Sequence, residues 1–338
     1  MKAVVTQGGF SLDDEKSFLD VEMPAPTPGP HDLLVRVKAI ALNPIDTKLR
    51  KKELAGNPPR ILGWDAAGEV IETGKEVTKF QKGDRVYYSG TPTRPGSNAQ
   101  FQCVDERLVG AMPASISFEE AAALPLTSLT AWELLFERMG IPMNKGMTEG
   151  KDLLVVGGAG GVGSILIQLA RYFTNLRIIA TASNPESKEW CLKNGAHLVI
   201  DHSKDLNQEL DQNGIKTIPY IALLAATTPY FELAAKRMAP FGTIGAIVDV
   251  TEPTDLNLLK PKSARFVWEF MFARPVNNTA DMNIQGEILN ELGLLIDQKI
   301  LHTTLGEVAG ELSASKIREL HGRIEKGHTK GKLVLKVP

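Results

Sequence analysis

The sequence predicts an α/β protein in which a doubly wound parallel sheet is inserted between two pieces of a partly open β-barrel domain. Its 338 residues are more than twice the roughly 150 residues of a typical domain, which favours two domains. Up to about residue 126, short strands are separated by turns, whereas from Asp152 apolar strands alternate with helical patterns. The chain ends in a further apolar strand, Gly331–Val337, that has no local partner.

The barrel domain is predicted from strands that are polar on one side. Leu33–Ile40 places Arg36 and Lys38 in alternation with apolar residues, as a half-buried strand does, and 68–71 and 83–88 repeat this style. The proline-rich segment 24–30 suits neither a helix nor a central strand, so we expect a connector there. Because the final strand needs a partner, we expect it to return to this barrel. The predicted barrel domain therefore comprises residues 1–126 and 273–338.

The inserted domain, residues 127–272, is predicted from strands that are apolar throughout. Alternation of such strands with helices indicates a parallel sheet covered on both faces. The strands are expected at 153–156, 177–180, 198–200, 220–224 and 243–248. A helix over 185–194 is indicated by Asn184 as N-cap, Pro185 in the first turn and Gly195 after the end. In the last part of the chain, Ser313 and Gly327 bracket a further helix.

Composition excludes several classes of protein. The formal net charge is −2 with 43% hydrophobic residues, which argues against a nucleic-acid partner. Two cysteines, Cys103 and Cys191, allow one disulfide at most and no four-cysteine zinc knuckle, so we expect a reducing compartment. We find no signal-peptide pattern and no apolar run of the roughly 18 residues that a membrane span needs. We therefore predict a cytoplasmic protein without a membrane partner.

A glycine-rich segment after the strand at 153–156 carries the main functional signal. Gly158, Gly160, Gly161, Val162 and Gly163 match the GxGxxG pattern and open a helix. Glycines let a backbone approach a pyrophosphate, whose charge the helix N-terminus stabilises. The alternative is a turn that only packs a helix on the sheet. Because strand, turn and helix follow in the required order, we favour a dinucleotide.

The end of the next strand bears on which dinucleotide binds. An NAD site places a carboxylate there, about 20 residues after the glycines, for the ribose hydroxyls. This chain has Ala180-Thr181-Ala182-Ser183-Asn184, followed by Lys188. With hydroxyl donors and a lysine instead of a carboxylate, we predict NADPH, with Ser183 and Lys188 as contacts. For Lys188 the alternative is a solvated helix lysine, and Glu186 nearby is read as a charge matched to the helix dipole.

On these residues the chain resembles the medium-chain dehydrogenase/reductase superfamily. The resemblance is to its quinone oxidoreductase (zeta-crystallin-like) branch and to a subgroup labelled zinc-type alcohol dehydrogenase-like. It covers essentially the whole length and implies a Rossmann domain inserted into a GroES-like barrel. The motifs that carry it are 63–70, 83–86, Pro125 to Trp132, 158–163 with Gln168 and Arg171, and 268–272.

The resemblance also permits a test for zinc. Zinc alcohol dehydrogenases take ligands from a Cys, from the His of a Gly-His-Glu segment, and from a further Cys or Glu. Here Asn43 stands at the position of the Cys, and Trp64 and Asp65 replace the His and Glu of that segment. Neither Asn nor Trp supplies the thiolate or imidazole that holds Zn²⁺. The six histidines include no close ligand pair; His321 and His328 lie seven apart. We therefore predict no metal.

Without a Lewis acid, the resemblance implies NADPH-dependent reduction of a quinone or an α,β-unsaturated carbonyl, because such acceptors delocalise charge onto their own oxygen. Asn43 is a candidate donor to that oxygen or, alternatively, a turn residue before Pro44. Lys48 occupies a position where relatives often have Tyr, and Tyr88 is a further candidate donor or a packing residue. These three residues are the predicted catalytic residues.

Further cofactor contacts are assigned by position. Thr130 matches a threonine that contacts the nicotinamide carboxamide in relatives, or it is a helix N-terminal residue. His202 and Phe272 complete the predicted cofactor set, although core packing is the default explanation for Phe272 and its neighbour Phe270. Both cysteines are read as small buried hydrophobes.

Two other functions stay open at this point. One is an alcohol dehydrogenase-type oxidoreductase, against which the missing zinc ligands speak. The other is a non-catalytic NADPH-binding protein, whose marks would be a degraded glycine loop or a basic patch. We also predict a homodimer, formed through an edge strand near Thr243–Val248 as in relatives.

Overall fold

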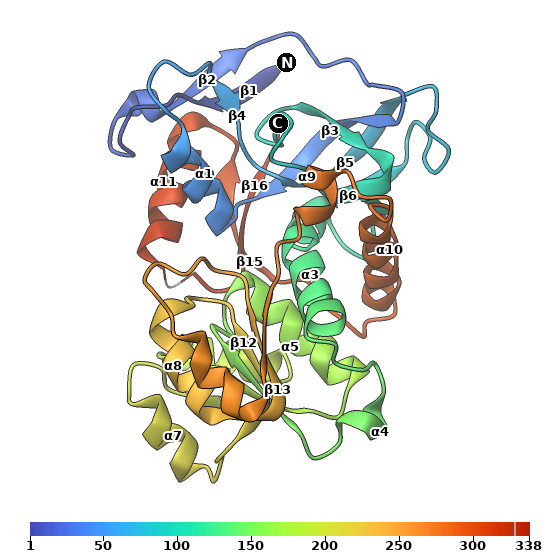
Figure 1. The fold of residues 1–338 in the computed structure, drawn as a ribbon. Coiled ribbons are helices and arrows are strands. Elements are labelled where there is room, and N and C mark those ends of the chain that lie inside the picture. The colour runs from blue at the N-terminus through green and yellow to red at the C-terminus, as the bar shows by residue number, and fades with distance from the viewer. Residues whose placement is uncertain (328) are drawn as a thin grey trace. The chain divides into compact units, whose positions relative to one another are not determined.

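The structure is a computed structural model that describes residues 1–327 and 329–338, so His328 lies outside the described residues. It divides into two units (Figure 1). The first comprises Met1–Leu129 and Phe272–Pro338, and the second comprises Thr130–Met271. The predicted α/β class with an inserted parallel sheet is confirmed. Each unit is described by itself below.

The first unit is built on two sheets. In the smaller sheet, β1 lies between β2 and β4, and all pairs are antiparallel. In the larger sheet the order is β15-β16-β3-β5-β6-β8, and β7 also pairs with β3. Their bounds are β1 Lys2–Thr6, β2 Phe18–Glu22, β3 Asp32–Ala41, β4 Arg60–Ile61, β5 Asp65–Thr73, β6 Arg85–Ser89, β7 Phe101–Asp105, β8 Val109–Ala111, β15 Leu305–Glu311 and β16 Lys332–Lys336.

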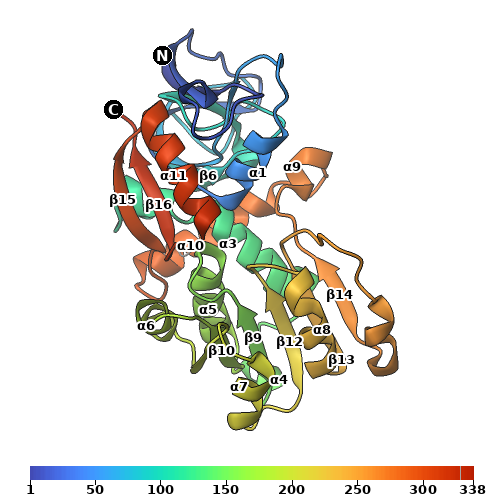
Figure 2. The ribbon, with the colours of Figure 1, turned by 90° about the vertical axis from the view of Figure 1, so that its left-hand side faces the viewer.

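The C-terminal strand β16 returns to the barrel, as predicted. It pairs antiparallel with β3, with Val334 opposite Ala41. It also pairs in parallel with β15, and Figure 2 shows these two strands side by side. The sequence did not indicate β15, because two glycines interrupt it, Gly306 and Gly310, and all of its residues are partly or largely exposed.

Helices of the first unit cover these sheets. The helix α11 begins after the N-cap Ser313, whose hydroxyl accepts from Lys316 N, and ends at Gly327, as predicted. Its Ile317 and Leu320 are fully buried. The bounds are η1 Glu15–Ser17, α1 Pro44–Lys52, η2 Glu106–Leu108, α2 Phe118–Ala122, α9 Ala273–Asn277, α10 Ile284–Asp297 and α11 Ala314–Lys326; α3, Pro125–Trp132, includes the boundary between the units.

The second unit is a parallel six-stranded sheet in the order β11-β10-β9-β12-β13-β14. Its strands are β9 Asp152–Val156, β10 Arg177–Thr181, β11 Leu198–Ile200, β12 Ile218–Leu223, β13 Met238–Ala246 and β14 Arg265–Trp268. Its helices are η3 Glu133–Arg138, α4 Lys145–Thr148, α5 Gly161–Phe173, α6 Pro185–Lys193, α7 Leu206–Gln212, α8 Thr228–Arg237 and η4 Leu256–Lys262. Asn184 caps α6 by accepting from Ser187 N at 2.9 Å, as predicted.

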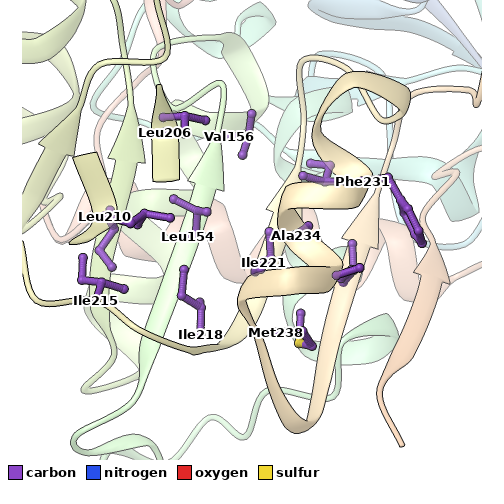
Figure 3. Packing of buried hydrophobic residues seen from close by; sticks show 14 of the residues in the cluster. Leu154, Val156, Leu206, Leu210, Ile215, Ile218, Ile221, Phe231, Ala234 and Met238 are labelled. Atoms are coloured by element: carbon purple, nitrogen blue, oxygen red, sulfur yellow. The ribbon is translucent and has the colours of Figure 1, made fainter. Parts of the chain in front are cut away.

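Side chains cover this sheet on both faces. Figure 3 shows Leu154 and Val156 of β9 packed with Leu206 and Leu210 of α7, and Phe231 of α8 belongs to the same buried cluster. Successive strand residues point to opposite faces. Accordingly, Ile244 and Ala246 of β13 belong to this cluster, whereas a Cβ on Gly245 between them would meet Leu134 of η3 at 2.6 Å. This placement explains why the strands are apolar throughout.

The edge of this sheet differs from the expectation. Thr243–Ala246 of β13 is not at the edge, because β14 pairs with it over Thr243–Ala246 and Arg265–Trp268. The short β14 was not recognised because it has four residues and begins with Arg265. Its Trp268 is 47% exposed, and Phe270 beyond it is 51% exposed.

Among the helices of the described residues, none has the length and apolar character needed to cross a membrane.

Candidate functional site

The glycine loop connects β9 to α5 in the second unit. The chain order along the sheet reverses at β9, because β10 and β11 lie on one side of it and β12 on the other. In open parallel sheets, ligands bind beyond the carboxyl ends of strands at such a reversal. Gly157 makes the turn there with a φ of 91°, a conformation that favours glycine.

The glycines of the loop differ in how close a Cβ atom placed on each would come to neighbouring atoms. At Gly158 a Cβ would lie 2.7 Å from the Ala180 Cβ, and at Gly163 it would lie 2.4 Å from the Gly157 carbonyl oxygen. Close packing therefore explains these two glycines. At Gly160 the nearest atom, the Gly157 oxygen, is 3.6 Å away, and φ is −70°. Neither packing nor backbone strain explains why Gly160 lacks a side chain.

The loop ends at the N-terminus of α5, which has 13 residues with Gly160 as N-cap. The N–H groups of Gly161, Val162 and Gly163 have no acceptor within the helix, because they lie in its first turn. The first turn also contains no acidic residue. Together with the helix dipole, these groups favour an anion such as a pyrophosphate. The residues present therefore fit a dinucleotide.

The predicted cofactor residues Ser183 and His202 lie just after the ends of β10 and β11, respectively. The Thr181 hydroxyl oxygen, at the end of β10, accepts from Gly157 N at 3.1 Å. The same oxygen is 3.2 Å from His202 Nδ1, which follows β11. Thr181 thus links the glycine loop to His202. Ser183 is partly exposed just after β10.

Lys188 has a partner that sequence reasoning missed. Its Nζ lies 3.3 Å from Asp201 Oδ2, and Asp201 follows β11 directly. The Ser203 hydroxyl donates to Asp201 Oδ1 at 2.7 Å. These hydrogen bonds lower the pKa of Asp201 to about 2, and those from Ser203 have a larger effect than the one from Lys188. A carboxylate therefore does lie beside Lys188, one strand further along than the position considered in the sequence.

The other predicted cofactor residues are largely buried. Thr130 lies in α3 with 5% of its surface exposed. Phe272, at the N-cap of α9 in the first unit, packs edge-on against Trp64 with ring centroids 6.0 Å apart. Its surroundings agree with the packing explanation, and Phe270 is the more exposed of the two aromatic residues.

In the first unit, Asn43 belongs to a buried polar cluster. Asn43 Nδ2 donates to Asp65 Oδ2 at 2.9 Å, and Asn43 Oδ1 accepts from Lys332 Nζ. Lys332 Nζ also lies 3.0 Å from Asp65 Oδ2, while Asp65 Oδ1 accepts from Leu126 N at 2.7 Å. Asn43 and Asp65 have no exposed surface. We refer to Asn43, Asp65 and Lys332 as the lysine cluster.

Asp46 adjoins this cluster. Its Oδ2 accepts from Asn43 N at 2.8 Å, which fixes the start of α1. Burial raises the pKa of Asp46 to about 7, although the hydrogen bond from Asn43 and the charge of Lys332 act in the opposite direction.

The remaining predicted catalytic residues are Tyr88 and Lys48. Tyr88 in β6 is fully buried, and its hydroxyl donates to Gln102 Oε1 at 3.0 Å. Burial raises the pKa of this hydroxyl further. Tyr88 therefore does not suit a proton donor, and the packing alternative explains it. Lys48 is partly exposed in α1.

The lysine cluster does not suit zinc. Zn²⁺ is held by thiolate, imidazole and carboxylate groups in a tetrahedron. Here only Asp65 is of that kind, and the Lys332 ammonium lies against it. Within residues 1–327 and 329–338, no group of three His, Cys, Asp or Glu side chains is placed to hold a metal ion.

Comparison with known families gives two matches. Residues 29–130 match the alcohol dehydrogenase GroES-like domain, and residues 161–266 match the zinc-binding dehydrogenase family.

Comparison with individual proteins covers the whole chain. A zinc-type alcohol dehydrogenase-like protein of Staphylococcus epidermidis is 39% identical over 99% of both chains. An NADPH-dependent alkenal/one oxidoreductase of Arabidopsis thaliana chloroplasts is 28% identical over 90% of this chain and 71% of its own. A Rhizobium etli structure assigned to zinc-dependent alcohol dehydrogenases superposes with a TM-score of 0.93 at 42% identity, covering 99% of this chain and 98% of that one. A quinone oxidoreductase of Coxiella burnetii gives 0.81 at 28% identity over 100% and 99%.

Proposed function

Because the chain belongs to the medium-chain dehydrogenase/reductase superfamily, we propose that it is a zinc-independent, NADPH-dependent reductase of quinones or α,β-unsaturated carbonyls. The observation that carries this proposal is the pair of sites just described: an open dinucleotide loop at Gly160 and an ammonium beside Asp65 where zinc relatives need ligands. Both matching family models are named for dehydrogenases, and the Arabidopsis and Coxiella relatives are named as oxidoreductases. The kind of acceptor is inferred from the chemistry that an enzyme without a metal can perform.

The cofactor proposal rests on the second unit. The loop 158–163 and the N-terminus of α5 would hold the pyrophosphate, and Ser183, Lys188 and His202 would lie toward the adenosine end. Thr130 is the proposed contact of the carboxamide. When bound, NADPH supplies a hydride. The name of the Arabidopsis relative, an NADPH-dependent enzyme, supports this choice of dinucleotide.

The acceptor proposal rests on the same physical argument. Hydride addition to a quinone or an enone places negative charge on the acceptor's own oxygen, so the chain needs orientation and a hydrogen-bond donor rather than a Lewis acid. Oxidation of a simple alcohol without a metal would require a strong base. Lys48 in helix α1 is our candidate for the proton donor, and we propose that Asn43, the N-cap of the same helix, helps to position it. Relatives named as quinone and alkenal reductases support this class of acceptor.

The experiment is NADPH consumption against quinones, 2-alkenals and cyclic enones, each with and without a chelator. We expect turnover of at least one class, unchanged by the chelator, and slower turnover with NADH. Turnover of alcohols that is lost with the chelator would favour the alcohol dehydrogenase alternative. NADPH binding, followed by intrinsic fluorescence, without turnover of any acceptor would favour a non-catalytic NADPH-binding protein.

We further propose a cytoplasmic homodimer. Beside β13 the edge strand of the sheet is β14. Its residue Trp268 is exposed, and so is Phe270, which follows the strand. Light scattering during size-exclusion chromatography tests the dimer, since a mass near the chain's 36.8 kDa would contradict it.

A further inference from the structure

The Lys332 ammonium is almost completely buried against oxygen atoms. Its side chain is 3% exposed, and Asp65, its anionic partner, is 0% exposed. The ammonium donates to Asn43 Oδ1 and lies 3.0 Å from Asp65 Oδ2. The acceptors are a neutral amide oxygen and a carboxylate, which are the oxygen ligands that hard cations also use.

Strand register brings these three residues together. Ala41 of β3 is opposite Val334 of β16 and opposite Asp65 of β5. Because both pairings are antiparallel, Asn43, two residues after Ala41, comes level with Lys332, two residues before Val334. The hydrogen bond from Leu42 N to Leu333 O, at 3.0 Å, continues that register. The core of the barrel sheet therefore fixes the cluster, and no mobile loop is needed to form it.

Charge explains why a cation must be present. A buried carboxylate without a partner strongly destabilises a fold. Asp65 receives one backbone N–H and one amide N–H, and Lys332 supplies the compensating charge. One ammonium and one carboxylate make this part of the cluster neutral.

We propose that the Lys332 ammonium is the permanent cation of this site, and that its presence closes the site to divalent metal ions. The Nζ atom occupies the space between the Asn43 and Asp65 oxygens in which a small hard cation would lie. Without Lys332 the same space would combine two oxygen ligands with an uncompensated negative charge. This inference does not depend on the proposed reaction, because its readout is metal binding.

Mn²⁺ is the probe, and thermal unfolding and electron paramagnetic resonance titration are the measurements. We compare wild type, Lys332→Ala, Lys332→Met and the double variant Lys332→Ala with Asp65→Asn. Lys332→Ala removes the charge and vacates the space, whereas Lys332→Met removes the charge and keeps the space filled. We expect Mn²⁺ to bind Lys332→Ala and raise its unfolding midpoint, and to leave the other three proteins unchanged.

Stability without metal gives a second test in case Lys332→Ala does not fold. Lys332→Met leaves Asp65 unpaired, so we expect its unfolding midpoint to fall by on the order of 10 °C. Adding Asp65→Asn removes the uncompensated charge, so most of that loss should be regained. Three results would overturn the proposal. They are Mn²⁺ binding by the wild type, equal Mn²⁺ binding by Lys332→Ala and Lys332→Met, and an unfolding midpoint that does not recover when Asp65→Asn is added to Lys332→Met.

Discussion

Lys188 and Asp201 form an ion pair, with Nζ 3.3 Å from Oδ2, that joins helix α6 to the end of strand β11. Asp201 also accepts from the Ser203 hydroxyl and the Ser203 backbone N–H. The lysine on which the choice of NADPH rests is therefore held by a carboxylate. A 2′-phosphate must compete with that carboxylate for the Lys188 ammonium.

This pair predicts how Asp201 influences the choice of cofactor. We expect Asp201→Asn to tighten NADPH binding several-fold, because it frees Lys188 and removes a negative charge near the phosphate. NADH, which has no 2′-phosphate, should bind with little change. Fluorescence titration with both cofactors measures the two dissociation constants.

The control separates the two causes. Adding Lys188→Met to Asp201→Asn should cancel the gain if release of the lysine is responsible. An equal gain for NADPH and NADH, or none for NADPH, would show that this end of the sheet does not contact the phosphate.

The open space at Gly160 gives a test of the dinucleotide loop itself. A Cβ at Gly160 would lie 3.6 Å from its nearest atom. The free energy of unfolding of Gly160→Ala should therefore be within about 1 kcal/mol of the wild-type value. If a pyrophosphate lies against this backbone, the same methyl group should weaken NADPH binding by on the order of 10-fold or more. Calorimetric unfolding and NADPH titration are the two measurements.

Gly163→Ala is the matched comparison. Its Cβ would lie 2.4 Å from the Gly157 oxygen, so this variant should lose stability as well as cofactor binding. A stable Gly160→Ala that binds NADPH as the wild type does would indicate that the loop only packs α5 on the sheet.

Two buried carboxyl groups share Arg138 in the second unit and predict an alkaline loss of stability. Arg138 Nη2 lies 3.2 Å from Glu133 Oε2, and Arg138 Nε lies 2.9 Å from Glu269 Oε2. The side chains of both glutamates have no exposed surface. Burial first, and then the charge of Glu133, raise the pKa of Glu269. A carboxyl with a raised pKa in the folded state stabilises the fold below its ordinary pKa and loses that contribution as pH rises through the raised value.

Glu269→Gln keeps the shape of the protonated acid and removes its titration. We expect it to cost less than about 1 kcal/mol near pH 6 and to reduce the fall in stability toward alkaline pH. Denaturant unfolding between pH 6 and 9 measures this. Glu137, 3.3 Å from the same arginine but partly exposed, provides the control, since Glu137→Gln should keep the wild-type pH dependence. A wild-type stability that is flat over this range would argue against a raised pKa at Glu269.

The buried His321 in α11 should make the fold less stable at acidic pH. The ring is fully buried against Phe18 with centroids 4.9 Å apart, and neither ring nitrogen finds a partner in the described part of the chain. Burial, reinforced by Arg50 and opposed by Glu325, lowers the pKa of His321 to about 3. The neutral His321 ring therefore contributes fully to the stability of the fold above its ordinary pKa near 6.5, and this contribution is lost as pH falls toward 3.

We expect His321→Phe to flatten this acidic limb, which in the wild type amounts to on the order of 4 kcal/mol between pH 7 and 3. Unfolding by urea at several pH values provides the measurement. His31, which is half exposed beside Glu76, is the control, because His31→Gln should leave the limb in place. An unchanged limb in His321→Phe would assign the acid sensitivity to other groups.

Local patterns were sufficient to predict the class of fold. Alternation of apolar strands with capped helices predicted the parallel sheet, and the caps at Asn184 and Ser313 are where the sequence indicated. The strand β14 was missed because it has only four residues and begins with a charge, and β15 because its two glycines and its exposed side chains leave no clear period. Such strands are formed by pairing with their neighbours.

The candidate site divides in the same way. The glycine loop could be recognised from residue types and spacing along the chain, whereas Asn43 and Trp64, at positions where zinc relatives have ligands, were identified through the resemblance to a family. The partners of Lys188 and Asn43 could not, since Asp201 and Lys332 reach them through hydrogen-bonded strands and, for Lys332, across 289 positions of sequence. Asp201 directly after β11 and Lys332 at the start of β16 were visible as residues, but their charges acquire a role only through strand register and burial. Folding thus determined which charges are neutralised, because a hydrogen bond or an ion pair depends on distance in space and not on distance along the chain.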